Sequence, residues 1–353
     1  MQNKNSYNFA LDLLKKLIET PSLSGEEEPT AQLIRNWLEK QGISSFLTHN
    51  NVWALNKYFD PAQPTILLNS HHDTVLPNTG YSRNPYQAQI ENGKLYGLGS
   101  NDAGASLVSL LSTFVYFYDK PHLRYNLVMA ATGEEESSGP NGLNSLLQEL
   151  PELSFALVGE PTQMQMAIAE KGLLVLDGYA PGIAGHAAHT NTDNAIYNAL
   201  DDINWFRKYT FPKESPLLGK VKMTVTQINA GSAHNVVPAE CHFVVDIRVN
   251  EHYRNEELFE FIQQHTQSNM VARSFHLNPS FIDPGHPIVK AGKKWGRETY
   301  GSPTLSDQSV LSCPSLKMGP GDSKRSHQAD EFIFLNELEE GISLYINILK
   351  EIL

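Results

Sequence analysis

The sequence has little cysteine and nothing that resembles a secretion signal. Its 353 residues include only two cysteines, Cys241 and Cys313, which lie far apart and outside any C-x-x-C spacing. This argues against a disulfide framework and favours a reducing compartment. The N-terminal stretch, M-Q-N-K-N-S-Y-N-F-A, lacks the apolar core of a signal peptide. We therefore expect a cytoplasmic protein.

Positive charge and long apolar runs are also scarce. Lysine and arginine number 27 against 39 aspartates and glutamates, which gives a formal net charge of -12. Such a balance argues against nucleic acid or an anionic membrane as a partner. No run of about 18 apolar residues occurs, so we expect no membrane-spanning helix. The chain is long for a single hydrophobic core, which makes two domains the default expectation.

The first part of the chain alternates helical and strand patterns, which indicates an α/β fold. Apolar residues recur at helical spacing, and proline or glycine ends each of the early helices. Short apolar runs bounded by polar residues are typical of buried strands. The pattern predicts helices at 7–19, 26–41 and 103–118, a strand pair at 46–53 and 65–69, and further strands at 126–131 and 155–158.

The pattern changes after Gly172. Residues 220–229 alternate between polar and apolar side chains, as in a half-buried antiparallel strand. The elements follow in the order β-α-β-β-α-β, which indicates a ferredoxin-like unit inserted into a larger α/β domain. The predicted strands are 173–179, 220–229, 242–249 and 271–277, and the predicted helices are 193–208 and 256–267.

The insertion sets the predicted domain boundaries. Residues 1–172 and 278–353 form one domain in this division, and residues 173–277 form the other. After the insertion we expect a helix at 288–299, a short strand at 316–318 and a last helix at 336–349.

The stretch I-L-L-N-S-H-H-D-T-V, residues 66–75, is the first place where chemistry is indicated. A short apolar strand ends there, and His71, His72 and Asp73 follow. Ligands of open α/β sheets bind beyond the carboxyl ends of the strands. A histidine with a carboxylate two residues later suits a metal ligand and its orienting partner. The stretch alone fits a solvated surface loop equally well.

The same context recurs along the chain, because polar residues follow each predicted buried strand. Many carboxylates at one sheet edge repel one another unless a cation neutralises them. Imidazoles mixed with carboxylates suit Zn²⁺, with Co²⁺ or Mn²⁺ as substitutes. The candidates are His71 and Asp73, then Asp102 as the N-cap of the helix at 103–118, then Glu134, Glu135 and Glu136, then Glu160, and finally His327.

Five motifs in order give the sequence a specific likeness. They read H-H-D-T-V, G-L-G-S-N-D, T-G-E-E-E-S, V-G-E-P-T and M-G-P-G-D-S followed by S-H-Q-A-D-E. This set resembles the M20 metallopeptidase and aminoacylase family, in its acetylornithine deacetylase and succinyl-diaminopimelate desuccinylase group. The resemblance implies a zinc-peptidase-like catalytic domain, with a mixed central sheet flanked by helices, and an inserted α+β domain that acts as a lid and forms a homodimer.

The resemblance also implies roles for the site residues. Asp73 would orient His71, and Glu135 would be the general base that moves a proton from water to the leaving amine. Two divalent metal ions, about 3.5–4 Å apart as in two-metal sites generally, would share one carboxylate. His71 and Glu160 would hold one ion, Glu136 and His327 the other, and Asp102 would bridge both.

The inserted domain carries further motifs of the same likeness. G-H-A-A-H-T implies that His189, rather than His186, reaches a neighbouring subunit's active site to stabilise an oxyanion. H-N-V-V-P and D-I-R imply that Asn235 and Arg248 bind the substrate carboxylate, which arginine can hold with two hydrogen bonds. The alternative for His189 is a loop histidine whose hydrogen bonds are made within its own subunit. The alternative for Arg248 is a surface or interface ion pair.

The resemblance implies an enzyme that removes an N-acyl group from an amino acid. Glu160 at the third carboxylate position favours N-acetyl- or N-succinyl-ornithine or -citrulline, and so arginine biosynthesis. A dipeptidase or carboxypeptidase of the same family, a succinyl-diaminopimelate desuccinylase and a non-catalytic metal-storage protein are the alternatives. Leu76 and Gly104 depart from the family pattern, so the acyl group and the amino acid stay open.

Overall fold

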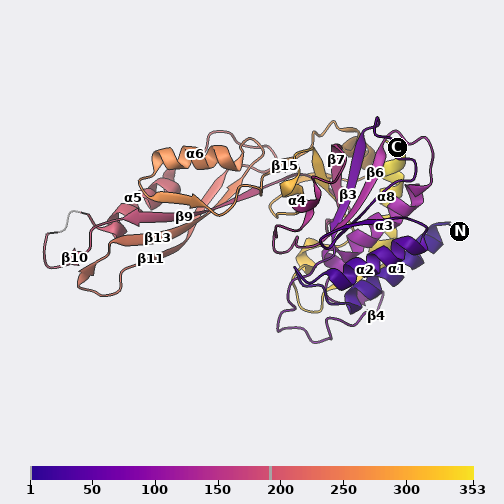
Figure 1. The fold of residues 1–353 in the computed structure, drawn as a ribbon, viewed down its shortest axis with the longest axis horizontal. Coiled ribbons are helices and arrows are strands. Elements are labelled where there is room, and N and C mark those ends of the chain that lie inside the picture. The colour runs from indigo at the N-terminus through magenta and orange to yellow at the C-terminus, as the bar shows by residue number, and fades with distance from the viewer. Residues whose placement is uncertain (1, 191–192) are drawn as a thin grey trace. The chain divides into compact units, whose positions relative to one another are not determined.

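The computed structural model describes residues 2–190 and 193–353, and the chain divides into two compact units (Figure 1). Unit 1 comprises Met1–Ile168, Phe281–Tyr300 and Ser306–Leu353. Unit 2 comprises Ala169–Ser280 and Gly301–Leu305. The second segment of unit 2 lies outside the insertion bounds of 173–277 that the sequence indicates.

A mixed nine-stranded sheet forms the centre of unit 1, in the order β1-β2-β6-β3-β7-β17-β8-β15 with β16 paired to β8. β3 runs parallel to β6 and β7, and β17 runs parallel to β7, whereas β2 is antiparallel to β6. The strands are β1 Phe46–Thr48, β2 Asn51–Leu55, β3 Thr65–His71, β6 Asn126–Thr132, β7 Leu153–Val158, β8 Met166–Glu170, β15 Ser280–Phe281, β16 Thr299–Ser302 and β17 Ser315–Lys317.

Helices flank this sheet (Figure 1). α3 packs on β3 and β6, and α1 and α8 pack on α3. Every residue of β3 and β6 is buried, because the parallel centre of such a sheet is covered on both faces. The helices are α1 Gln2–Glu19, α2 Glu28–Lys40, α3 Ala105–Tyr118, α4 Leu143–Leu146, α7 Pro287–Lys294 and α8 Leu335–Lys350. The predicted α/β class with flanking helices is confirmed.

Shorter elements complete unit 1. β4 Gln89–Glu91, β5 Lys94–Tyr96 and β18 Phe332–Phe334 form a three-stranded sheet in the order β18-β5-β4. Three short helical segments join the longer elements: the π-helical η1 Ser100–Gly104 and the 3₁₀ helices η2 Asp307–Val310 and η3 Ser323–Arg325.

Unit 2 is a four-stranded antiparallel sheet in the order β11-β13-β9-β14, with α5 and α6 packed on it. With the connection order β9, α5, β11, β13, α6, β14, this is the ferredoxin-like arrangement that the sequence predicts. Its apolar core includes Leu176, Phe243 and Ile262. The elements are β9 Gly172–Pro181, α5 Ala195–Lys208, β11 Lys222–Ala230, β13 Glu240–Val249, α6 Asn255–His265 and β14 Asn269–Ala272, with a small pair of β10 Gly185–His186 and β12 Val236–Val237.

Three sequence-based expectations for the elements are wrong. The predicted pairing of 46–53 with 65–69 does not form, because β1 and β2 make a hairpin and β6 lies between β2 and β3. The predicted strand 271–277 ends at Ala272. Beyond it, the side-chain amide of Asn255 donates hydrogen bonds to the carbonyl oxygens of Phe275 and Leu277. The predicted helix 288–299 ends at Lys294, and β16 begins at Thr299.

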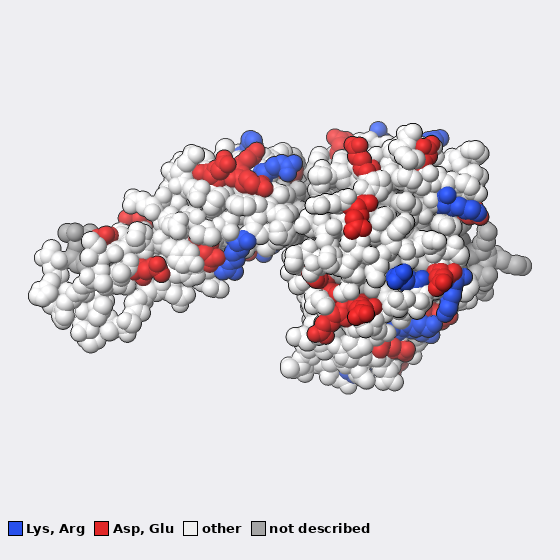
Figure 2. All heavy atoms as spheres, viewed as in Figure 1, with Lys and Arg blue, Asp and Glu red and all other residues white. Residues whose placement is uncertain are grey.

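The surface charge agrees with the acidic composition. On the face that Figure 2 shows, acidic side chains gather in groups on each unit, and basic side chains lie among them. Within the described part of the chain, no helix is both long and apolar enough to cross a membrane.

Candidate metal centre

His71 is the last residue of β3 and is 1% exposed. Its Nδ1 lies 3.1 Å from the backbone carbonyl oxygen of Asp73 and 3.3 Å from Asp73 Oδ1. The opposite ring nitrogen, Nε2, is buried and has no hydrogen-bond partner among the described residues. A buried nitrogen without a partner is costly. The ring is therefore oriented with its Nε2 open to a ligand that the protein does not supply.

Asp73 connects His71 to the loop that follows β6. Its carboxylate accepts hydrogen bonds from the backbone N–H groups of Glu135, at 3.2 Å, and Glu136, at 3.1 Å. The hydroxyl of Ser24 donates a third at 2.6 Å. Burial raises the pKa of Asp73, but its hydrogen bond and charge interaction with His71 outweigh this, so its pKa lies below the ordinary value. Asp73 thus stands as an anion that orients both the imidazole and the Glu135–Glu136 backbone.

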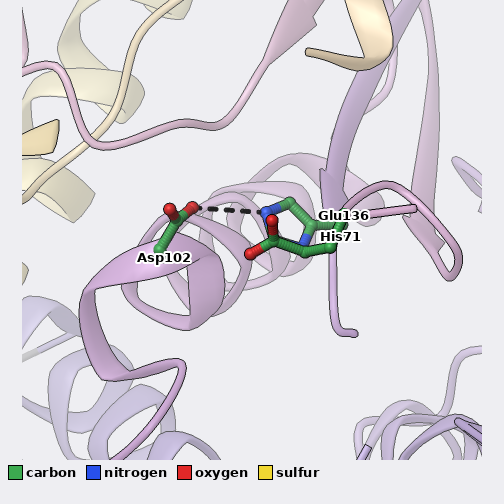
Figure 3. Close-up of side chains that lie close together, drawn as sticks. All are labelled: His71, Asp102 and Glu136. Carbon is green, nitrogen blue, oxygen red and sulfur yellow. Dashed lines mark ion pairs between the residues drawn. The ribbon is translucent and has the colours of Figure 1, made fainter. Parts of the chain in front are cut away.

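Three carboxylates surround the open side of His71. Nε2 lies 3.4 Å from Asp102 Oδ1, 3.7 Å from Glu160 Oε1 and 3.9 Å from Glu135 Oε2. Figure 3 shows His71 and Asp102 pointing toward each other, with Glu136 beside them. Two groups, each within 4.8 Å, have the atoms to hold a metal ion: His71 with Asp102 and Glu136, and His71 with Glu135 and Glu160.

Asp102 lies between the two predicted histidine ligands. Its Oδ1 faces His71, and its Oδ2 lies 3.7 Å from His327 Nε2. His327 Nε2 also lies 3.0 Å from Glu136 Oε2. The two oxygens of one carboxylate thus face two different imidazoles. A carboxylate that bridges two metal ions needs this arrangement.

The predicted capping role of Asp102 is wrong. α3 begins at Ala105, and its N-cap is Gly104. Asp102 lies inside η1 with φ -118° and ψ 99°, followed by a cis peptide bond to Ala103. Its side chain is directed at the histidines instead of the helix N-terminus.

Gly104 departs from the family pattern for a packing reason. A Cβ at this position would lie 2.4 Å from the carbonyl oxygen of Gly99 and 2.8 Å from a methyl carbon of Leu14. The backbone N–H of Gly104 donates to the same carbonyl oxygen of Gly99 at 2.9 Å. The turn closes so tightly that no side chain fits. Leu76, the other departure, is 72% exposed, and nothing in the structure explains it.

The crowded carboxylates are hard to ionise together. Burial and the charge of Asp102 raise the pKa of Glu160 to about 8. Burial also raises the pKa of Glu135 well above its ordinary value. The hydrogen bond that the His327 ring makes to the Glu136 carboxylate raises the pKa of His327 to about 9. Oε1 of Glu160, like Nε2 of His71, is buried and has no hydrogen-bond partner in the described part of the chain. The nitrogen and oxygen atoms therefore fit divalent cations, which would neutralise the carboxylates and complete both orphaned atoms.

Neighbouring residues in the same motifs face elsewhere. The carboxylate of Glu134 accepts the backbone and side-chain N–H groups of Asn141, each at 2.9 Å, so it faces away from the centre. His72 points to the opposite side of the strand, where Nδ1 lies 2.9 Å from Thr30 Oγ1 and Nε2 lies 3.0 Å from the carbonyl oxygen of Asn50. Alternation along an extended chain separates it from His71.

Three buried carboxylates near the centre do not stand out in the sequence. Glu27 accepts the backbone N–H of Glu134 at 3.0 Å, and Asp307 accepts the hydroxyl of Thr132 at 2.8 Å. Glu331 accepts backbone N–H groups of η1. Glu27 lies in an acidic run, and Asp307 follows no predicted strand. Only Glu331 belongs to a quoted motif, as the last residue of S-H-Q-A-D-E.

All the candidate metal ligands belong to unit 1, whereas three other predicted residues belong to unit 2. His189 is exposed in the loop after β10, with its ring 5.6 Å from that of His186. Asn235 is exposed, and its carbonyl oxygen accepts the N–H of Ala187 at 2.9 Å. Arg248 on β13 makes two hydrogen bonds, 2.9 and 3.1 Å long, to Asp246 on the same strand.

A mixed α/β domain that gathers imidazoles and carboxylates at the ends of its strands is typical of metal-dependent hydrolases. The chain belongs to the M20 family, because the sequence model of peptidase family M20/M25/M40 matches residues 67–351.

Known proteins are similar to this chain over nearly its full length. The chain is 25% identical to a succinyl-diaminopimelate desuccinylase of Thioalkalivibrio sulfidiphilus, covering 97% of this chain and 98% of that protein. It is 26% identical to an acetylornithine deacetylase of Proteus mirabilis, covering 93% of each. The fold is similar to that of a dinuclear metal-binding M20 peptidase from Bacillus subtilis, with a TM-score of 0.73, 17% identity and coverage of 99% of this chain and 98% of that one.

Family and fold together make the protein a metal-dependent hydrolase of amide bonds. A small amino acid derivative or a peptide is the class of substrate that agrees with this family.

Proposed function

We propose that the protein removes an N-acyl group from an amino acid with the help of two divalent metal ions, Zn²⁺ being the first choice and Co²⁺ or Mn²⁺ substitutes. His71 and Glu160 would hold one ion, Glu136 and His327 the other, and Asp102 would bridge them. The observation that carries this proposal is Asp102, whose two oxygens face His71 and His327 at 3.4 and 3.7 Å. When bound, such ions lower the pKa of water and polarise the amide carbonyl.

Glu135 is the acid that moves the proton. It accepts a proton from the attacking water as the new C–O bond forms, and it delivers that proton to the amine as the C–N bond breaks. The second proton of the water also passes to the amine, so the products are a carboxylate and a protonated amine, and atoms and charge balance. A buried carboxyl whose pKa is raised well above its ordinary value suits an acid that both takes and returns a proton near neutral pH.

Asp73 is the positioning residue of this mechanism. Its carboxylate fixes the His71 ring and accepts the N–H groups of Glu135 and Glu136. The proton-transferring acid and a metal ligand on the next residue therefore share one support.

The favoured substrates are N-acetylornithine, N-acetylcitrulline and N-succinylornithine, which belong to arginine biosynthesis. The similarity to a deacetylase and to a desuccinylase supports an N-acyl substrate. A peptidase is the second candidate, because the fold is similar to that of a metal-binding peptidase. Succinyl-diaminopimelate desuccinylase activity is the third. The unpaired cysteines, Cys241 and Cys313, support a reducing compartment, and we propose the cytoplasm.

A panel of substrates separates these candidates. We expect the Zn²⁺-loaded protein to release ornithine or citrulline from their N-acetyl or N-succinyl forms at a kcat/KM at least about tenfold above that for any dipeptide. A tenfold difference corresponds to about 1.4 kcal/mol of transition-state stabilisation. The measurement is amine release by chromatography, with N-succinyl-diaminopimelate and dipeptides as parallel substrates. Turnover of dipeptides alone would reject the deacylase in favour of the peptidase.

We propose that unit 2 serves as lid and dimerisation domain, with His189 reaching the partner's active site and Asn235 and Arg248 binding the substrate carboxylate. The exposure of His189 supports a role outside its own subunit's core. Arg248 already holds Asp246, so a substrate carboxylate would have to share or displace that pair.

Replacing His189 tests the trans role. We expect His189→Ala to lower kcat by about 10²–10³-fold, because one donor to the oxyanion is lost. Light scattering should still show dimers. His186→Ala is the matched control from the same motif and should keep most of the activity. A wild-type rate for His189→Ala would remove this residue from the mechanism.

A further inference from the structure

Glu331 is a buried carboxylate that binds the backbone of the turn containing Asp102. It precedes β18 and is 2% exposed. Its Oε1 accepts the N–H groups of Asn101 at 2.8 Å and Asp102 at 2.9 Å, and its Oε2 accepts the N–H of Gly99 at 3.1 Å. Its backbone carbonyl takes a fourth N–H, that of Gly97, at 3.0 Å. One residue thus accepts four backbone N–H groups from a six-residue segment, Gly97 to Asp102, about 230 positions earlier in the chain.

The turn cannot satisfy these donors itself. Asp102 has non-helical φ and ψ inside η1, and Gly99 before it has a φ of 74°. Regular helical hydrogen bonds are therefore lost just where the backbone is buried, and an unpaired buried N–H is costly. Glu331 replaces those hydrogen bonds and fixes the peptide from which the Asp102 side chain leaves.

Glu331 is itself not available to a cation. Both of its oxygens are already occupied by backbone N–H groups, and the side chain is buried. Its influence on a metal ion must therefore pass through Asp102.

A second connection joins the same turn to the loop that carries His327. The side chain of Asn101 accepts the N–H of Asp322 at 3.0 Å and donates to the carbonyl oxygen of Asp322 at 3.1 Å. Glu331 lies four residues after His327 in that loop. The two segments that carry Asp102 and His327 are thus connected by side-chain-to-backbone hydrogen bonds.

We propose that Glu331 is a positioning residue, which holds Asp102 so that its two oxygens serve two metal ions at once. This inference rests on the proposed two-metal function. Loss of Glu331 should impair the shared ligand more than the separate ones. Supporting residues around a metal site typically change metal affinity by about 10–100-fold when they are replaced.

Manganese is the probe for this role, because two Mn²⁺ ions that share a ligand are magnetically coupled. We expect the wild-type protein to bind two Mn²⁺ by calorimetry and to give a coupled signal by electron paramagnetic resonance. In Glu331→Gln the amide N–H₂ would oppose a backbone N–H, so the turn is released. The tighter ion should stay, the second should bind about 10–100-fold more weakly, and the coupled signal should be lost.

Two further variants make the result decisive. Asp202→Asn is the matched control, since Asp202 is also buried and accepts the backbone N–H groups of Gln267 and Ser268, but in unit 2. It should lose stability and keep both ions coupled. Glu331→Asp retains the charge on a shorter side chain, and it serves if Glu331→Gln does not fold; it should also weaken the second ion.

The outcomes are distinct. Weaker binding and lost coupling in a Glu331 variant, with the control unchanged, support the proposal. A folded Glu331 variant that binds two coupled Mn²⁺ ions as tightly as wild type overturns it. Wild-type protein that binds fewer than two Mn²⁺ ions overturns the two-metal function, and the inference with it.

Discussion

Replacing Glu135 with glutamine should abolish most of the activity and leave the metal content unchanged. The variant keeps the size of the side chain but cannot accept a proton, and general acid–base catalysis contributes about 10²–10⁴-fold to a rate. Glu135 Oε2 lies 3.9 Å from Nε2 of His71, one of the proposed metal ligands. We therefore expect kcat to fall by this factor while two ions remain bound. Steady-state kinetics and metal analysis of the same sample check this result.

The two neighbouring glutamates provide matched controls for that experiment. Glu134 faces Asn141, so Glu134→Gln should keep most of the activity. Glu136 lies 3.0 Å from His327, so Glu136→Gln should lose metal as well as turnover. Three adjacent residues of one type would then show three different behaviours. Full activity in Glu135→Gln would refute the assignment of the base, and metal loss there would make Glu135 a ligand.

Each residue of the predicted ligand set has a local signal in the sequence, and the structure brings these side chains together. His71, Glu136 and Glu160 follow short apolar runs, and the sheet brings the ends of β3, β6 and β7 to one edge. The order of elements in unit 2 is equally local, since alternation and helical spacing can be counted along the chain. Such patterns show where each strand runs and where it ends. This is enough to place the side chains that directly follow the strands.

The supporting contacts are not accessible in this way. Glu331 binds backbone N–H groups about 230 residues away, and a backbone N–H has no side-chain signature in the sequence. The cap predicted at Asp102 fails for a related reason: the backbone there is not helical, and its N–H is accepted by Glu331, which is distant in the sequence. Glu27 and Asp307 likewise act on residues distant in sequence, Glu134 and Thr132.

Removing the metal should abolish activity and make stability strongly dependent on pH. Without ions, the pKa of Glu160 is about 8, and that of His327 is about 9. Each value lies above that of the unfolded chain, so the folded protein binds more protons and its stability falls as pH rises. The stability that Glu160 contributes is lost between pH 4.5, its ordinary pKa, and about pH 8. The contribution of His327 is lost between pH 6.5 and about pH 9. We expect the melting temperature of chelator-treated protein to fall steadily between these limits.

Bound metal should reverse this trend, because a cation favours ionised carboxylates and neutral imidazoles. Each ion present at about 100 times its Kd adds about 2.7 kcal/mol of stability. The gain in melting temperature on adding Zn²⁺ should therefore grow as the pH rises from 6 toward 9. Asp202→Asn, whose carboxylate lies in unit 2, should show the same growth from a lower starting temperature. A gain that stays constant over this range would mean that Glu160 and His327 do not lose protons to the metal, and the proposed ligand set would be wrong.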